Sequence, residues 1–234
     1  MATAADRRDD EPLDALADLL SQRADLVPPA QHLDAVRPTA LVPSCTRVHD
    51  VLLLSSLGYN VVALAADPGA LRQAEETTAK ASADKRFAPT GAWESGNINW
   101  LVGDFFSEDE LKGLGTAGSG TFDLIYDNAF LSTIPPNLRP RWASRMAQLL
   151  RPSGRLVCLE SPSRKPLSEQ GAPWGLRPEI YEALLSAPGK DVAYNSDGSL
   201  VETTAAKPDA NALHRLSIIR PQRTPGDFIS VWAP

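Results

Sequence analysis

Two acidic residues stand where apolar runs typical of β-strands end. Asp104 follows the run Ile98–Val102, and Asp127 follows the run at residues 122–126. In open α/β sheets, ligands bind in the crevice outside the carboxyl ends of the strands, so both carboxylates are candidates for a site there. For Asp104, an equally good interpretation is the N-cap of a helix that begins near Ser107.

The residues after Asp127 add an amide and an aromatic side chain. Asn128 and Phe130 would line the substrate side of such a crevice, and Trp174, in a later loop, would add a second aromatic wall. Asp127 itself would offer a carboxylate for catalysis. The alternatives are a turn that Asn128 stabilises and a core position for Trp174.

A histidine and a cysteine lie near the start of a helix predicted at residues 48–57. The positive end of the helix dipole favours a neutral imidazole, so His49 could act as a catalytic base. The same setting stabilises a thiolate at Cys45 in the preceding loop. The alternative for His49 is packing and hydrogen bonding under the loop. Because His32 and His214 lie far apart in the chain, no spacing predicts a metal site.

Alternating strand and helix patterns would position these residues. Apolar runs predict strands at Thr39–Val42, Asn60–Ala65, Ile98–Val102 and residues 122–126 and 155–160. Helical periodicity and capping signals predict helices at residues 13–24, 48–57, 68–81 and 135–150, the third with Asp67-Pro68 at its start. Two closing runs, at His214–Ile219 and residues 228–232, are joined by a turn rich in Pro and Gly, which predicts an antiparallel hairpin. The fold class is therefore a Rossmann-like α/β fold with a doubly wound, mostly parallel sheet.

The composition favours one globular domain over residues 1–234, with residues 1–12 flexible. An apolar content of 43% lets a chain of 234 residues bury a large core. The net charge of −6 and the lack of clustered Lys and Arg argue against nucleic-acid binding. No apolar span is long enough for a membrane helix, and the polar N-terminus does not resemble a secretory signal. Since two cysteines fit a reducing compartment, we expect a cytoplasmic protein.

Several motifs spaced along the chain resemble those of the thiol and thiopurine S-methyltransferase family. They are Val42-Pro43-x-Cys45-x-x-x-His49-Asp50, Leu57-Gly58-Tyr59, Gly103-Asp104-Phe105-Phe106, Phe122-Asp123-x-Ile125-Tyr126-Asp127 and Pro173-Trp174-Gly175-Leu176. The resemblance covers residues 13–234. It implies a class I methyltransferase fold with a seven-stranded sheet and S-adenosylmethionine (SAM) as cofactor, with the residue matching Asp104 close to the adenine. It also supplies a cysteine at position 45, which favours a structural role for Cys45.

The chain departs from that family at the expected cofactor site. Ser44, Thr46 and Val48 replace three glycines of the first loop. Such a loop uses glycine because its backbone reaches positive φ and because a Cβ would collide with the ligand. Ala65 replaces the acidic residue that holds the ribose hydroxyls, and residues 1–12 lack the tryptophans of a segment that closes over the cofactor. We therefore expect a degenerate SAM site and no cofactor.

The main functional hypothesis is an enzyme of secondary metabolism that no longer transfers methyl groups. It would use His49, Asp127 and Cys45 for rearrangement, cyclisation, or thiol and disulfide chemistry on a small molecule, and Asp104 would be a remnant of cofactor binding. The first alternative is a SAM-dependent thiol S-methyltransferase with a divergent loop, which binds the cofactor through Asp104 and main-chain contacts. Asp67, two residues after Ala65, is a candidate to substitute for the lost acidic residue.

A second alternative is a non-catalytic scaffold that binds a protein partner or forms a homo-oligomer. A crevice filled by side chains, together with a large apolar surface patch, would favour the scaffold. An open pocket lined by Asp127, Phe130 and Trp174 would favour catalysis.

Overall fold

The computed structural model describes residues 14–27, 36–45, 48–81, 87–89, 94–107, 121–162, 164–201, 209–221 and 226–234. The expectations for residues 1–12, for His32 and for Thr46 fall outside the described residues. So does the helix expected to continue beyond Ser107.

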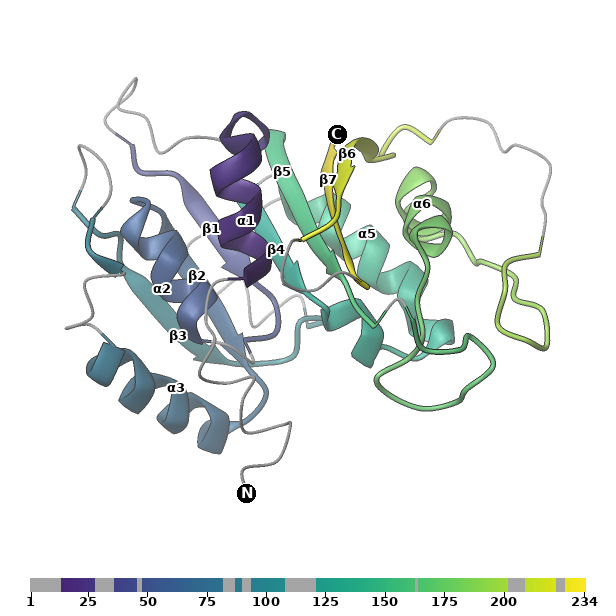
Figure 1. Ribbon diagram of the computed structural model, residues 1–234, viewed down its shortest axis with the longest axis horizontal. Helices are drawn as coiled ribbons and strands as arrows, with labels where there is room; N and C mark the ends of the chain where they lie inside the picture. The colour runs from purple at the N-terminus through teal and green to yellow at the C-terminus, as the bar shows by residue number, and fades with distance from the viewer. Residues whose placement is uncertain are drawn as a thin grey trace.

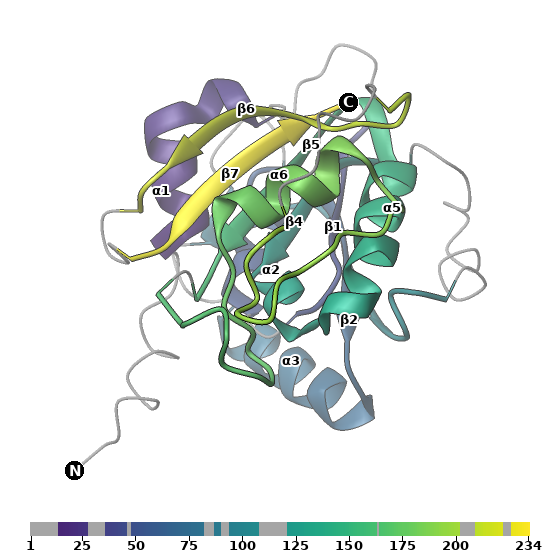
Figure 2. The same cartoon turned by 90° about the vertical axis from the view of Figure 1, so that its right-hand side faces the viewer.

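A seven-stranded sheet runs through the structure (Figure 1). Its strands are β1 (Thr39–Val42), β2 (Asn60–Ala65), β3 (Ile98–Val102), β4 (Phe122–Asn128), β5 (Leu150–Glu160), β6 (His214–Ile219) and β7 (Phe228–Ala233). The order across the sheet is β3-β2-β1-β4-β5-β7-β6. Strands β1 to β5 pair in parallel, whereas β7 runs antiparallel to β5 and β6, which lie side by side with it in Figure 2.

Helices cover both faces of the sheet. They are α1 (Asp14–Arg23), α2 (Val48–Ser56), α3 (Pro68–Ala81), α5 (Arg139–Leu149) and α6 (Pro178–Ser186), with short 3-10 turns η1 (Ala24–Leu26), η4 (Phe130–Thr133) and η5 (Pro136–Leu138). Because successive side chains of a strand point to opposite faces, β1 contributes to two cores. Ala40 and Val42 pack with residues of α1 and α2, while Leu41 packs with residues of α5 and α6. A strand buried on both sides reads as a continuous apolar run, as β1 does.

The observed sheet confirms the predicted fold class, including the antiparallel closing hairpin. The bounds of β1, β2 and β3 agree with the prediction. Strand β4 continues beyond its predicted end to Asn128. Strand β5 begins earlier than predicted because Leu150 pairs with Phe122 before a shift in register.

Two helices differ from the sequence-based expectation. The helix expected at residues 135–150 is shorter, since η5 precedes α5 and Pro140 occupies the first turn of α5, where the missing N–H has no helical partner to lose. Helix α6 was not predicted. Its signal is present in the sequence, because Pro178 opens the helix and the buried residues recur at helical spacing, namely Ile180, Tyr181, Leu184 and Leu185.

Candidate functional site

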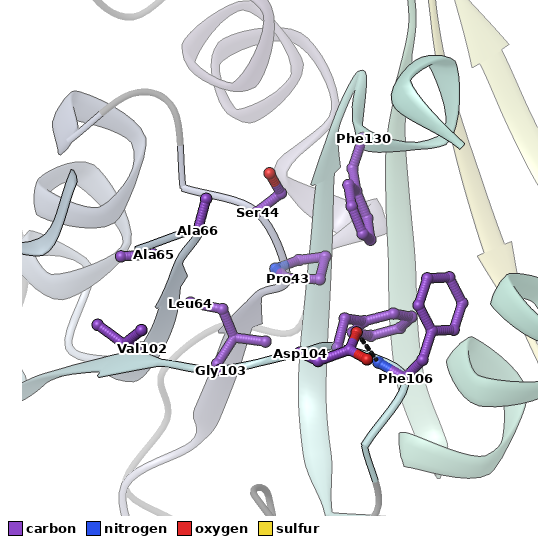
Figure 3. Close-up of a pocket in the computed structure, with 11 residues that line it drawn as sticks. Pro43, Ser44, Leu64, Ala65, Ala66, Val102, Gly103, Asp104, Phe106 and Phe130 are labelled. Atoms are coloured by element: carbon purple, nitrogen blue, oxygen red, sulfur yellow. Dashed lines mark hydrogen bonds between the residues drawn. The ribbon is translucent and has the colours of Figure 1, made fainter. Parts of the chain in front are cut away.

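A pocket of about 510 Å³ opens at the carboxyl ends of β1, β2 and β3 (Figure 3). The residues that line it are Pro43, Ser44, Leu64, Ala65, Ala66, Val102, Gly103, Asp104, Phe105, Phe106 and Phe130. Strand β1 lies between β2 and β4, and the helices that follow β1 and β4 pack on opposite faces of the sheet. The loops that follow β1 and β4 therefore diverge. A crevice forms between them, at the point where ligands bind in open α/β sheets.

The loop after β1 forms one wall of the pocket without glycine. The N–H of Cys45 donates to the carbonyl oxygen of Leu64 at 2.8 Å, which holds the loop across the end of β2. Among the described non-glycine residues, only Ala129 has a positive φ. Ser44 and Val48 therefore do not adopt the positive φ that glycine permits. Cys45 packs against the core on the α1 and α2 side and does not line this pocket.

The end of β2 contributes two alanines, Ala65 and Ala66, to the pocket lining. Asp67 follows, and its Oδ1 accepts hydrogen bonds from the N–H of Gly69 at 2.7 Å and of Ala70 at 2.9 Å. The bond from Ala70, and then that from Gly69, lowers the pKa of Asp67. Asp67 is therefore engaged as a cap of α3, and it is not among the residues that line the pocket.

The turn after β3 contributes a carboxylate and two aromatic rings. Asp104 is exposed, and its Oδ1 accepts a hydrogen bond from the N–H of Phe106 at 2.9 Å, drawn as a dashed line in Figure 3. Its carbonyl oxygen accepts another from the N–H of Ser107 at 2.9 Å. The ring of Phe105 packs edge to face against Phe130, with ring centroids 5.4 Å apart. Asp104 is thus the charged residue of a pocket that has an aromatic wall.

Asp127 does not lie where the sequence predicted. Its side chain is 0% exposed. Oδ1 accepts from the N–H of Phe130 at 2.6 Å and of Leu131 at 3.4 Å, and Oδ2 accepts from Nε1 of Trp142 at 2.9 Å. Burial raises the pKa of Asp127 to about 7, against the opposing effect of these donors. The expectation that its carboxylate faces a substrate is wrong, because the carboxylate caps the turn after β4, a role expected of Asn128.

Asn128 and His49 make their contacts away from the pocket. The Nδ2 of Asn128 donates to Oδ2 of Asp50 at 2.6 Å, which joins the end of β4 to the first turn of α2. His49 is half-buried, and its ring stacks against Phe87 with centroids 5.8 Å apart. The packing interpretation therefore suits His49. The structure does not gather the three expected catalytic residues in this pocket.

A buried arginine that was not predicted opens α5 at the same edge of the sheet. Arg139 is 2% exposed, and its guanidinium carbon lies 5.9 Å from the ring centroid of Trp174 and 5.5 Å from that of Tyr194. Its Nε donates to the carbonyl oxygen of Ile134 at 3.3 Å, and no carboxylate in the described part of the chain forms an ion pair with it. The hydroxyls of Tyr181 and Tyr194 are buried and find no hydrogen-bond partner among the described residues. A buried charge of this kind is normally paired, so Arg139 is a candidate to receive an anion. No local sequence pattern distinguishes it from other arginines.

A second buried carboxylate lies at the end of β5. Glu160 is 1% exposed, and its Oε1 accepts a hydrogen bond from Oγ of Ser230. Its Oε2 is buried and has no hydrogen-bond partner within the described ranges of the chain. Nε1 of Trp232 donates to the same Oγ at 2.8 Å. Burial raises the pKa of Glu160 to about 7. This network packs against the α5 and α6 face and does not contribute to the pocket lining.

The strand order, with β7 antiparallel between β5 and β6, and a pocket at the carboxyl edge define a class I methyltransferase fold. Solved structures with this fold include the PH0226 protein from Pyrococcus horikoshii OT3, with a TM-score of 0.54 and 12% sequence identity over 99% of this chain and 92% of that chain. Another is magnesium protoporphyrin IX methyltransferase from Synechocystis PCC 6803, solved with bound SAM. It has a TM-score of 0.55 and 11% sequence identity over 94% of this chain and 77% of that chain.

The chain belongs to the thiopurine S-methyltransferase family, whose sequence model matches residues 24–216, so the predicted family is confirmed. It is similar to thiocyanate methyltransferase 1 of Brassica oleracea, at 32% identity over 148 residues, which are 62% of this chain and 55% of that protein. It is also similar to the thiopurine S-methyltransferase of Stutzerimonas stutzeri, at 28% identity over 118 residues, which are 50% of this chain and 48% of that protein. The chain thus spans about half the length of these curated relatives.

Neither a membrane-spanning helix nor a metal site is found in the part of the chain that the structure describes. No helix there has both the length and the hydropathy needed to cross a membrane. No group of three or more His, Cys, Asp or Glu side chains there is arranged to hold a metal ion.

Proposed function

We propose that this chain is a SAM-dependent methyltransferase that transfers a methyl group to the sulfur of a small anionic acceptor. The observation that carries the proposal is the pocket of about 510 Å³ at the carboxyl ends of β1 to β3, which is open and has the size of a small-molecule site. Relatives named for thiocyanate and thiopurine methylation support sulfur as the accepting atom. The proposal corresponds to the first alternative that the sequence left open. It includes SAM as cofactor, whereas the main hypothesis from the sequence expected no cofactor.

The pocket residues fit SAM. Phe106 and Phe130 offer apolar rings against which an adenine can pack, and the carboxylate of Asp104 can accept a hydrogen bond from its amino group. Ser44 and Ala65 are small, so the side chains that replace the family's residues leave room beside the backbone. When bound, the cofactor supplies a methyl group on a positively charged sulfur.

Arg139 suits the acceptor. A buried guanidinium without a carboxylate partner stabilises an anion such as thiocyanate or a thiolate through charge-assisted hydrogen bonds. It also favours the deprotonated form of a thiol, which is the nucleophilic form. The rings of Trp174 and Tyr194 hold the guanidinium and exclude water, which strengthens its attraction for an anion.

Two assays test this proposal. Calorimetry with S-adenosylhomocysteine, the demethylated cofactor, should give a Kd below about 1 mM, equivalent to a binding free energy stronger than about −4 kcal/mol. Asp104→Ala should weaken binding about tenfold or more, whereas Asp67→Ala, whose carboxylate caps α3, should leave it unchanged. Transfer of labelled methyl from SAM to thiocyanate, hydrosulfide or an aromatic thiol is the second assay. Failure of both binding and transfer would refute the proposal.

A second candidate is a small-molecule enzyme of secondary metabolism that has lost methyl transfer. The end of β2 favours it, because Ala65 and Ala66 bring no carboxylate to hold ribose hydroxyls and Asp67 is engaged as a cap. Such a protein would bind S-adenosylhomocysteine more weakly than 1 mM and would accept another ligand in the same pocket. Crystals soaked with S-adenosylhomocysteine separate the two candidates by the density in the pocket. The open pocket gives the scaffold alternative no support.

A further inference from the structure

The carboxylate of Asp127 holds an unfavourable turn at the end of β4. The turn η4 follows directly after Ala129, whose φ of 56° lies in the left-handed region that is costly for a residue with a Cβ. The N–H groups of Phe130 and Leu131 both donate to Oδ1 of Asp127. Nε1 of Trp142, from α5, donates to Oδ2 and fixes the orientation of the carboxylate. One side chain therefore joins the end of β4, η4 and α5.

The first residue of this turn forms part of the candidate cofactor pocket. Phe130 lines the pocket, where its ring lies across from Asp104 and Phe106 in Figure 3. It packs edge to face against Phe105, also a lining residue, at 5.4 Å between ring centroids. A change in the direction of η4 would move this ring and reshape the aromatic wall.

The same turn anchors the loop that covers Arg139. The carbonyl oxygen of Ser132, in η4, accepts a hydrogen bond from the N–H of Trp174 at 2.6 Å. The ring of Trp174 lies against the guanidinium of Arg139, with 5.9 Å between its centroid and the guanidinium carbon. The position of Trp174 over Arg139 therefore depends on the position of η4.

We propose that Asp127 is a positioning residue that sets two walls of the active site at once, through η4. It places Phe130 against the cofactor and Trp174 against the arginine that receives the acceptor, and it takes no part in the reaction itself. The carboxylate is fully buried and its oxygens are occupied by three donors, so it cannot meet a substrate without breaking this network. The kinetic part of this inference rests on the proposed function, whereas the structural part does not.

The test compares Asp127→Asn with Asp123→Asn. Asparagine has only one acceptor oxygen. Its amide NH₂ group would face either the N–H groups of Phe130 and Leu131 or Nε1 of Trp142, which are all donors. Asp123 is a matched control at the opposite end of β4, where its carboxylate accepts from the N–H of Thr39 at 2.7 Å and pairs with Arg151 at 2.7 Å. For D127N we expect the Kd of S-adenosylhomocysteine and the KM of the acceptor each to rise about tenfold or more, with kcat changed less than about threefold. For D123N we expect neither constant to change.

Hydrogen exchange in the absence of ligand gives a readout that does not depend on activity. In D127N, peptides covering residues 129–134 and 171–176 should lose protection about tenfold, while peptides from β2 should not. Trp142→Phe keeps the hydrogen bond from the N–H of Phe130 to Asp127 and removes the indole donor, so the same peptides should lose less protection than in D127N. This variant replaces D127N in the test if D127N does not fold. Unchanged protection in these peptides would overturn the inference, as would a fall in kcat with unchanged KM and Kd. If the wild-type protein neither binds S-adenosylhomocysteine nor transfers a methyl group, the proposed function fails while hydrogen exchange still decides the role of Asp127.

Discussion

Replacing Arg139 by methionine removes the charge that we assign to acceptor binding while keeping a long, apolar side chain. The structure indicates that the fold should tolerate this change. Arg139 is 2% exposed and no described carboxylate pairs with it, so R139M leaves no buried charge without its partner. Replacement of a buried charge by an apolar residue of similar size is often neutral or stabilising. We therefore expect the unfolding free energy of R139M to equal or exceed that of the wild type.

The expected loss lies in acceptor binding. A hydrogen bond to a charged group contributes about 1.5 to 3 kcal/mol, and each 1.4 kcal/mol is a factor of about ten. The KM for thiocyanate or a thiol should therefore rise about 10- to 150-fold in R139M. Arg139→Lys should recover part of this loss, because lysine keeps the charge but lacks the planar group that packs between Trp174 and Tyr194.

Steady-state kinetics with varied acceptor at saturating SAM, together with calorimetry of S-adenosylhomocysteine, measures these effects. The Kd of S-adenosylhomocysteine should change by less than about twofold, since Arg139 does not line the cofactor pocket. Arg155→Met is the matched control, because Arg155 donates to the carbonyl oxygens of Ser153 and Gly154 at 3.0 and 2.8 Å, away from the carboxyl edge. An R139M variant with a wild-type acceptor KM would refute the assignment of Arg139.

Three further predictions follow from single side chains. Ala65→Asp should restore a carboxylate at the end of β2 and tighten S-adenosylhomocysteine binding about tenfold by calorimetry; an unchanged Kd would show that the ribose does not lie there. Glu160 has its pKa raised to about 7, whereas a glutamate in the unfolded chain ionises near 4.3, so between these values the folded chain retains a proton that the unfolded chain releases. The unfolding free energy of the wild type should therefore fall as pH rises from about 5 to 8. Measured by urea unfolding, the free energy of Glu160→Gln relative to that of the wild type should rise by on the order of 1–3 kcal/mol between these two pH values. The same difference between variant and wild type at both pH values would contradict this. Gly198→Ala should lower the Tm, because an alanine Cβ would meet the carbonyl oxygen of Leu167 at 2.3 Å at a φ of +79°, and an unchanged Tm would contradict that close approach.

The sequence predicted β1, β2 and β4 well because these strands are buried on both faces and therefore appear as continuous apolar runs between clear turn signals. Strands β1, β2 and β3 needed no tertiary information. The start of β5 could not be placed because Leu150 joins the sheet through a register shift with Phe122, which depends on the partner strand. Helix α6 could have been found from its apolar spacing.

The candidate site was harder to predict, because the direction of a side chain decides its role. Asp127 ends a strand, as a ligand-binding carboxylate would, but it lies two residues from Ile125 and therefore on the same buried face. Because β4 is buried on both faces, its apolar run does not distinguish the face that Asp127 shares. Arg139 and Trp174 are brought together by a loop whose path follows from contacts such as that between Trp174 and Ser132, which no sequence pattern encodes.

The missing glycines of the first loop were read from the sequence as the loss of a cofactor site. The described part of the loop needs no positive φ at Ser44, and that residue lines an open pocket. The substitution at Ser44 therefore changes the wall of the pocket without filling it. A carboxylate for the ribose is the feature of the family site that β2 does not supply, since Ala65 stands at its end.

The most direct test of the proposed function is a methyl-transfer assay with SAM labelled on its methyl group and thiocyanate, hydrosulfide or an aromatic thiol as acceptor. The account predicts a labelled S-methyl product whose formation saturates in both substrates, loses cofactor affinity in Asp104→Ala and loses acceptor affinity in Arg139→Met. A chain that forms no labelled product with any of these acceptors and binds S-adenosylhomocysteine more weakly than about 1 mM would contradict it.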